Sequence, residues 1–418
     1  MSYQIHHGDN REVLKNLADN SIDSVVTDPP YELGFMGKSW DATGVAYSVE
    51  LWQEVMRVLK PGGHLLAFSG SRTYHRMAVA IEDAGFEIRD QIMWIYGSGF
   101  PKSHDVSKGI DKQAGAEREV VGINDNVVRE SKIEGGSDYG GFTKANSDIT
   151  APATAEAKQW QGWGTALKPA HEPIVVARKP LIGTVAANVL TYGTGGLNID
   201  GSRVGNEEMI KTSSNGIVKS ENRSMSGPNY EREVVGTARG RWPANVIHDG
   251  SDEVVELFPD TKSGSGNKNT GNRAGLFGNL GAGNGDGIGG DSGSAARFFY
   301  CAKASKRDRN EGLDGFELKQ TIGGGGLTVV GGAYGSIKAP GQNHHPTVKP
   351  TELMRYLCRL VTPPGGIVLD PFMGSGSTGK AAMYEGFEFV GIELTDEYLP
   401  IAKARIEFAI EEMKARLL

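Results

Sequence analysis

Cysteine is scarce in this chain of 418 residues, which contains only Cys301 and Cys358. The two thiols lack the spacing of a metal site and cannot form a framework of several disulfides. No apolar run approaches the roughly 20 residues that a membrane-spanning helix needs, and the first residues show no basic segment followed by an apolar core. The sequence therefore predicts a soluble, cytoplasmic protein with no metal centre and no membrane partner.

Basic residues are also fewer than acidic residues, so the formal net charge is -7. A negative total weighs against a nucleic-acid partner, but local patches rather than totals bind phosphate. Residues 297–309 form one such patch, which fits a DNA-facing surface as well as it fits a solvated basic surface. Its basic residues and one lysine outside it are the candidate DNA contacts: Arg297, Lys303, Lys306, Arg307 and Lys102.

Glycine, by contrast, is abundant: the chain has 59 glycines, roughly twice the usual share. Twelve of them lie between Lys262 and Ser294, where almost nothing apolar is available to bury. Such a composition cannot hold a packed core, which predicts loops. Residues 181–340 as a whole offer only short apolar pieces, so we expect a large irregular insertion there.

Helices and strands alternate in the first hundred residues and again in the last seventy, and one further strand stands at residues 174–177, after a polar stretch from about residue 97 to residue 168. Buried strands are separated by helices that carry an apolar stripe. This pattern predicts one α/β domain, doubly wound around a mostly parallel sheet and built from both ends of the chain. The predicted strands are residues 24–27, 64–69, 86–96, 174–177, 367–370 and 389–393.

A glycine loop connects a strand and a helix in the C-terminal segment. Gly374 and Gly376 lack side chains, so the backbone can approach a nucleoside closely. Glu393 follows 19 residues after Gly374, at the end of the next strand, where a carboxylate can accept hydrogen bonds from ribose hydroxyls. An ordinary tight turn is the alternative for Gly-x-Gly alone. The predicted cofactor contacts here are Asp370, Pro371, Phe372, Gly374, Ser375, Gly376, Thr378 and Glu393.

A second motif, Asp28-Pro29-Pro30-Tyr31, directly follows a buried strand, where parallel sheets place their ligands. The two prolines fix the backbone and remove two N–H donors, so the loop is rich in hydrogen-bond acceptors. A strand-ending turn is the alternative meaning of Asp-Pro-Pro alone. We interpret Asp28, Pro29, Pro30 and Tyr31 as a catalytic loop.

The exocyclic amine of adenine or cytosine suits this loop, because its lone pair is delocalised into the ring and needs activation. If the Asp28 carboxylate and the Pro29 carbonyl accept the two N–H hydrogens, the lone pair becomes localised on nitrogen. Tyr31 offers an aromatic face on which a base turned out of the duplex can stack.

With these two loops, the sequence resembles the DNA amino-methyltransferases, which make N6-methyladenine or N4-methylcytosine. The catalytic loop precedes the Asp-Pro-Phe-Met-Gly-Ser-Gly-Ser loop, as in the permuted class called beta, and further segments are similar to phage-type members. The resemblance implies S-adenosylmethionine as cofactor and a Rossmann-like, seven-stranded sheet. It also implies that Asp9 contacts the adenine of the cofactor, and that Thr347 and Lys349 border its methionine end.

The same resemblance implies site-specific methylation of N6 of adenine in double-stranded DNA by base flipping. N4 of cytosine is the alternative, and an RNA or protein amine is a more distant one. Catalysis is assigned to residues 1–180, target recognition to residues 181–340, and cofactor binding to residues 341–418. A homodimer and a cognate restriction endonuclease are further partners that it suggests. Methylation of cytosine C5 is disfavoured, because neither cysteine follows a proline-rich catalytic turn.

Overall fold

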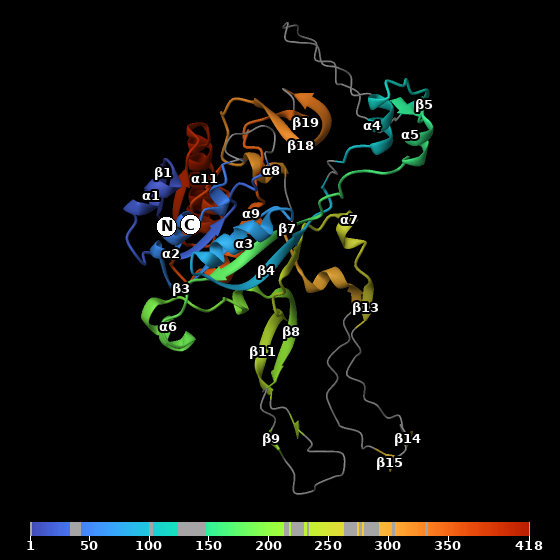
Figure 1. Ribbon diagram of the computed structural model, residues 1–418. Helices are drawn as coiled ribbons and strands as arrows, with labels where there is room; N and C mark the ends of the chain where they lie inside the picture. Colours follow the sequence, from blue (N-terminus) through green and yellow to red (C-terminus); the bar gives the residue numbers. More distant parts are fainter. Residues whose placement is uncertain are drawn as a thin grey trace.

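The computed structural model describes residues 2–33, 43–99, 103–123, 148–212, 217–218, 230–231, 234–262, 274–275, 278–279, 292–302, 306–330 and 333–417. Within these residues a large sheet lies at the centre with helices on both faces, while hairpins and a small helical unit project from it (Figure 1). The two ends of the chain lie close together beside the sheet.

Nine strands form the main sheet of the described residues, in the order β1-β21-β20-β2-β3-β7-β4-β12-β17. Neighbouring strands are parallel except at β7, which runs antiparallel to β3 and β4. The predicted mostly parallel α/β sheet is therefore present, and two short strands, β12 and β17, extend it to nine. The bounds are β1 (Tyr3–His7), β2 (Ile22–Thr27), β3 (Leu59–Phe68), β4 (Glu87–Ile95), β7 (His171–Arg178), β12 (Val246–His248), β17 (Tyr300–Cys301), β20 (Ile367–Asp370) and β21 (Glu388–Glu393).

Two apolar layers sandwich the sheet, because successive side chains of a strand point to opposite faces. In β2, Val26 packs into one layer and Val25 into the other. The first layer is completed by α9, α10 and α11, and the second by α2 and α3. These helices are α2 (Val49–Val58), α3 (Tyr74–Asp83), α9 (Thr351–Val361), α10 (Ser377–Tyr384) and α11 (Leu399–Leu417).

The helix ends show where the sequence pattern was informative. The sequence predicts a helix that begins after Pro350 and carries an apolar stripe of Leu353, Leu357 and Leu360, and α9 confirms both points. The sequence also predicts a turn at residues 61–63 between α2 and the next strand, and that prediction is wrong. Strand β3 already begins at Leu59, and these residues form an irregularity inside it, where Gly62 adopts a φ of 77°.

Smaller elements surround the central sheet. Helix α6 packs against β3, and the pairs β5–β6, β8–β11 and β18–β19 form antiparallel hairpins. None of the helices in the described ranges combines the length and apolar character needed to cross a membrane. The remaining bounds are α1 (Asn10–Val13), α4 (Val106–Gln113), β5 (Val120–Ile123), β6 (Asp148–Thr150), α5 (Ala155–Gln159), α6 (Val185–Tyr192), β8 (Val204–Thr212), β9 (Ile217–Val218), β10 (Tyr230–Glu231), β11 (Val234–Arg241), α7 (Asp252–Val255), β13 (Asp260–Lys262), β14 (Ala274–Gly275), β15 (Gly278–Asn279), β16 (Ser292–Ser294), α8 (Lys306–Asn310), β18 (Lys319–Val330) and β19 (Ala333–Gly341).

Candidate active site

Parallel pairing of β2 with β20 brings the two predicted loops together, although they are more than 300 residues apart in the sequence. Ser24 lies opposite Val368 and Val25 opposite Leu369, so both strands end at the same edge of the sheet. The Thr27 hydroxyl donates a hydrogen bond of 2.6 Å to Asp370 Oδ1 across this junction. A cavity of about 1750 Å³ opens at that edge, and both loops line it.

Asp370 organises the turn between β20 and α10. Its Oδ1 also accepts the backbone N–H of Phe372 at 3.1 Å, and its Oδ2 accepts the Thr378 hydroxyl at 2.6 Å. Burial raises the pKa of Asp370 to about 6, although the hydrogen bonds from Thr27, Thr378 and Phe372 oppose that rise. The carboxyl therefore fixes the shape of the loop before any ligand arrives.

The two glycines of this loop occupy positions that other residues fit poorly. Gly374 has a φ of 54°, and a Cβ there would lie 2.8 Å from His345 Nε2. Gly376 has a φ of 76° and is the N-cap of α10, where a Cβ would lie 2.9 Å from the Cα of Ala402. Close packing and left-handed backbone thus explain both glycines.

Glu393 lies at the end of β21 and closes the far side of the loop. Its Oε2 accepts the Gly374 N–H at 2.7 Å, and its Oε1 accepts the Thr395 N–H at 2.7 Å. Burial raises the pKa of this carboxyl against the effect of those bonds. Each oxygen keeps a second lone pair, so the carboxylate can brace the loop and still accept a ligand hydroxyl.

Arg405 supports the same loop from behind and was not found by sequence reasoning. Its fully buried guanidinium donates to the Ser375 carbonyl at 2.6 Å and to the hydroxyls of Ser375 and Ser377. Burial lowers its pKa to about 10. Only its place in a long amphipathic helix was visible in the sequence, and that gives no hint of this contact.

Asp9 and Asn10 connect the first helix to the cavity. Asp9 is the N-cap of α1, where its carboxylate accepts the Arg11 N–H at 2.9 Å and pairs with the Arg11 guanidinium. The Asn10 amide donates to the Pro371 carbonyl at 3.0 Å, which attaches α1 to the glycine loop. Both residues line the cavity, so the helix-capping role of Asp9 coexists with the predicted position near a ligand.

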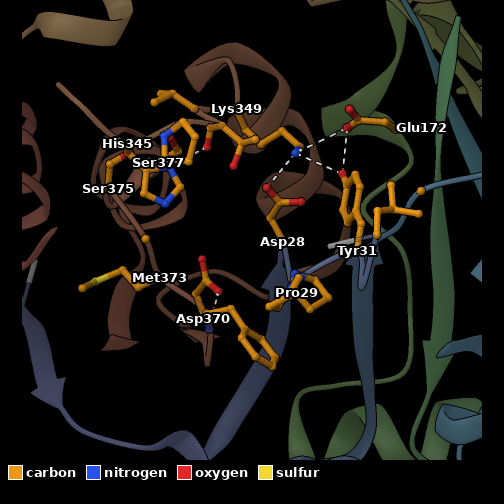
Figure 2. A pocket seen from close by; sticks show the side chains of 18 of the residues that line it. Asp28, Pro29, Tyr31, Glu172, His345, Lys349, Asp370, Met373, Ser375 and Ser377 are labelled. Atoms are coloured by element: carbon orange, nitrogen blue, oxygen red, sulfur yellow. Dashed lines mark hydrogen bonds and ion pairs between the residues drawn. The ribbon is translucent and has the colours of Figure 1, made fainter. Parts of the chain in front are cut away.

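Four side chains meet at the catalytic loop, and Lys349 is at their centre (Figure 2). The Lys349 ammonium lies 2.6 Å from Asp28 Oδ2, 3.1 Å from the Tyr31 hydroxyl and 3.3 Å from Glu172 Oε2. The Tyr31 hydroxyl donates to Glu172 Oε2 at 2.9 Å. Asp28 Oδ1 is buried and has no hydrogen-bond partner among the described residues.

Burial and charge act together on these groups. Burial, then the charges of Asp28 and Glu172, raise the pKa of Tyr31 well above its usual value, so the phenol stays protonated. Burial also raises the pKa of Glu172, against the Lys349 ammonium. For Lys349, burial lowers the pKa, but the two carboxylates outweigh it and the net shift is upward. Lys349 therefore remains charged in a site that excludes most water.

His345 links the segment before α9 to the glycine loop. Its Nδ1 lies 2.8 Å from the Thr347 carbonyl, and its Nε2 faces Gly374. Burial lowers the pKa of His345 to about 3, so the imidazole is neutral near pH 7. A neutral ring with Nδ1–H donating to Thr347 leaves Nε2 as an acceptor beside the loop.

The structure brings together nearly all of the residues predicted for catalysis and cofactor binding. Gly376 does not line the cavity but supports it as the cap of α10. The predicted residues that line the cavity are Asp9, Asp28, Pro29, Pro30, Tyr31, Thr347, Lys349, Asp370, Pro371, Phe372, Gly374, Ser375, Thr378 and Glu393.

Two of the candidate DNA contacts, Arg297 and Arg307, have described side chains, and neither lines the cavity. Lys102 and Lys303 lie outside the described residues, as does the side chain of Lys306. The Arg297 guanidinium donates to Thr261 and to the Ser294 carbonyl, and stacks over the Phe298 ring. Arg307 extends from α8 with its side chain 81% exposed and pairs with Glu311. Contact of these residues with DNA stays a prediction.

Sequence reasoning missed Glu172 as a member of the site. Glu172 stands in β7 beside a proline, and the only signal was its position at the start of a buried strand. Trp94 belongs to the core and also lines the cavity. Cys358 is fully buried on α9. The described residues contain no group of three or more side chains arranged to hold a metal ion.

A family model described as DNA methylase (N6_N4_Mtase) matches residues 22–404. Two proteins of Escherichia coli K12 match short stretches: one named as the methylase YubD, 45% identical over 69 residues, and the DNA adenine methyltransferase YhdJ, 42% identical over 66 residues. Each stretch covers 16% of this chain, and the matches span only 30% and 22% of those two relatives.

Two solved structures share some of the shape of the chain. The PvuII DNA methyltransferase (cytosine-N4-specific) is 14% identical, with a TM-score of 0.44 and coverage of 100% of this chain and 92% of that one. The M1.HpyAVI–SAM complex is 16% identical, with a TM-score of 0.37 and coverage of 97% and 99%. At these scores neither structure adds to the fold described above.

Proposed function

Because the chain belongs to the DNA methylase family, we propose that it is a site-specific DNA methyltransferase that modifies N6 of adenine in double-stranded DNA. S-adenosylmethionine is the methyl donor of this family. When bound, it supplies an electrophilic methyl group on a sulfonium centre. The protein must therefore bind this donor, bring an amine to it and make that amine nucleophilic.

The observation that carries the proposal is the state of Asp28. One carboxylate oxygen is held by Lys349 at 2.6 Å, while the other is buried and has no partner among the described residues. An unpaired buried acceptor is costly, so such an oxygen is expected to meet a donor when the site is in use. An exocyclic amine offers two N–H donors, one for Asp28 and one for the Pro29 carbonyl.

These two acceptors favour reaction at nitrogen. Hydrogen bonds to both N–H groups draw the lone pair out of the aromatic ring and localise it on nitrogen. Tyr31, which lies beside Asp28, supplies the ring on which the base stacks. The protonated state of the Tyr31 phenol adds no negative charge to compete with the carboxylate.

The glycine loop fits an adenosine-containing cofactor. It has no side chains at Gly374 and Gly376, and the Glu393 carboxylate stands behind it at the end of β21. We assign Glu393 to the ribose hydroxyls and Asp9 to the adenine side of the cofactor. The remaining loop residues, Asp370 to Thr378, form the wall against which the cofactor lies.

Adenine is the preferred target because the loop begins with Asp28; a serine there would favour cytosine. The same two acceptors can also hold N4 of cytosine, which makes N4-cytosine methylation the second candidate. An RNA or protein amine is more distant, since residues 181–340 supply a large segment suited to reading DNA. The order of the loops supports an assignment to the permuted beta class, and we propose DNA, a second copy of the chain and a cognate nuclease as partners.

The target base can be identified directly. The chain is expressed in a host that lacks DNA methylation, and its genomic DNA is digested to nucleosides for mass spectrometry. We expect N6-methyladenine. N4-methylcytosine without N6-methyladenine would reverse the choice of base, and the absence of both would overturn the proposed function. Long-read sequencing of the same DNA then gives the recognition site.

A further inference from the structure

Lys349 is placed to act on Asp28 rather than on a ligand. Its side chain is 7% exposed, and its ammonium has three N–H donors. Three acceptors surround it: Asp28 Oδ2, the Tyr31 hydroxyl and Glu172 Oε2, at 2.6, 3.1 and 3.3 Å. All three donors are therefore used within the protein, and none is left for the cofactor.

We propose that Lys349 and Glu172 are positioning residues that hold Asp28 and Tyr31 in the geometry needed to receive the target base. Lys349 binds Asp28 through Oδ2, which turns Oδ1 towards the incoming amine. Glu172 binds both Lys349 and the Tyr31 hydroxyl, so the carboxylate and the aromatic ring are fixed as one unit. This inference rests on the proposed methyl transfer, and it moves Lys349 from the methionine end of the cofactor to the catalytic loop.

The elements that supply these groups make the unit rigid. Asp28 follows the central strand β2, Glu172 belongs to β7, and Lys349 comes directly before α9. The Lys349 ammonium also lies 4.9 Å from the centre of the Phe68 ring, at the end of β3. Four separate elements thus meet at the Lys349 ammonium. In such a site, a displacement of a reacting group by about 1 Å can lower the rate about 100-fold.

The charges of the cluster should affect the pH dependence of methyl transfer. A purely structural role of Lys349 and Glu172 would leave that pH dependence unchanged. One ammonium faces two carboxylates at 2.6 and 3.3 Å, so a change in the charge of one group acts on the others. Removing the ammonium makes the carboxylates easier to protonate, whereas removing one carboxylate makes the other harder to protonate. The titratable groups that face Lys349 directly are Asp28, Tyr31 and Glu172. The next titratable neighbours of the cluster are Tyr96, His345 and Asp370.

The test uses Lys349→Met and Glu172→Gln in the full chain. Transfer of labelled methyl from S-adenosylmethionine to unmethylated genomic DNA is measured across pH, and cofactor affinity is measured by calorimetry. Lys60→Met is the matched control, because Lys60 forms a 2.6 Å ion pair with Asp23 and does not line the cavity. Wild-type protein without any transfer would contradict the proposed function itself, independently of these variants.

We expect Lys349→Met to lower the rate roughly 10- to 100-fold and to change cofactor affinity by no more than about threefold. The acid limb of the pH–rate profile of Lys349→Met should move to higher pH by roughly 1 to 3 units. The acid limb of the Glu172→Gln profile should move to lower pH. Lys60→Met should match the wild type. A large loss of cofactor affinity in Lys349→Met, or acid limbs that move in the same direction, would overturn the inference. If Lys349→Met does not fold, Glu172→Gln alone decides, since it keeps the Lys349–Asp28 pair.

Discussion

The two carboxylate oxygens of Asp28 differ in their partners, and the role of this carboxylate can be tested by substitution with alanine. Asp28→Ala removes the acceptor proposed for the amine, so we expect transfer to fall by roughly 100-fold or more. Cofactor affinity should remain, because the carboxylate acts on the base. The comparison is with Asp83→Ala, an exposed carboxylate at the end of α3. Substantial activity in Asp28→Ala would remove the role assigned to this residue.

Glu393 tests the cofactor side of the site. Glu393→Ala removes a carboxylate proposed to bind ribose, and charged hydrogen bonds of this kind contribute about 1.5 to 3 kcal/mol. Calorimetry should show the corresponding loss of S-adenosylmethionine affinity. Glu393 also braces the N–H groups of Gly374 and Thr395, so Glu393→Gln is measured in parallel as the milder change. Unchanged affinity in both variants would contradict the ribose assignment.

Asp370 predicts a pH effect on stability. Burial raises its pKa in the folded protein to about 6, well above the ordinary value of an aspartate. A raised pKa favours the protonated folded state, so this contribution to stability is complete below the unfolded pKa and is lost as pH rises through about 6. The shift corresponds to about 3 kcal/mol. Asp370→Asn cannot titrate, so its unfolding free energy should lack this loss.

Urea titrations of the wild type and Asp370→Asn between about pH 4 and pH 7 measure the effect. The difference between the two free energies should change with pH in the stated direction, whatever constant offset the substitution adds. Other groups titrate equally in both proteins and cancel. A difference that stays constant across this range would show that the hydrogen bonds from Thr27, Thr378 and Phe372 outweigh burial.

Individual site residues could be predicted from the sequence where a short motif indicates one particular local structure. Asp28 and Glu393 could be chosen from the sequence because Asp28 follows a buried strand and Glu393 ends one, and strand ends define the ligand edge of a parallel sheet. Glu172 and Arg405 could not be chosen. Their roles depend on contacts between elements far apart in the chain, and neither the spacing nor the composition around them reports such contacts.

At the scale of elements, Gly376 joins α10 to the glycine loop and packs against α11. Gly376→Ala places a side chain in left-handed backbone and 2.9 Å from the Cα of Ala402. Gly193, which ends α6, has the same φ of 76° but nothing within 4 Å of its Cβ position. Gly193→Ala should therefore cost about 1 kcal/mol, and Gly376→Ala clearly more. Urea unfolding of both variants checks this, and equal losses would contradict the close packing of α10.

Some strands could be predicted from the sequence and others could not. Strand β20 lies where predicted, because residues 367–369 are apolar and the strand is bounded by Gly366 and Pro371. Strands β12 and β17 were missed, since two or three residues are too few for a pattern of alternation. Strand β1 was also missed. It is an edge strand with mixed burial, and its pairing with β21 depends on the last part of the chain.

For the whole molecule, the strand order predicts that the N-terminal part cannot fold alone. A fragment of residues 1–340 lacks β20 and β21, as well as the three helices that complete one apolar layer. Strand β2 then loses β20, one of its two neighbours, and the face that carries Val26 loses the helices that cover it. We expect no cooperative thermal transition and no cofactor binding, measured by circular dichroism and calorimetry. A cooperative transition would mean that residues 1–340 fold without residues 341–418.

The pairing of β2 with β20 has a consequence for how the protein is made in the cell. About 340 residues separate the two strands, and ribosomes add roughly 5 to 20 residues per second. The catalytic strand therefore emerges roughly 20 to 70 seconds before its partner. During that interval the face of β2 that carries Val26 lacks the three C-terminal helices that complete its apolar layer. Nascent chains of this protein should therefore depend on chaperones until the final helices leave the ribosome.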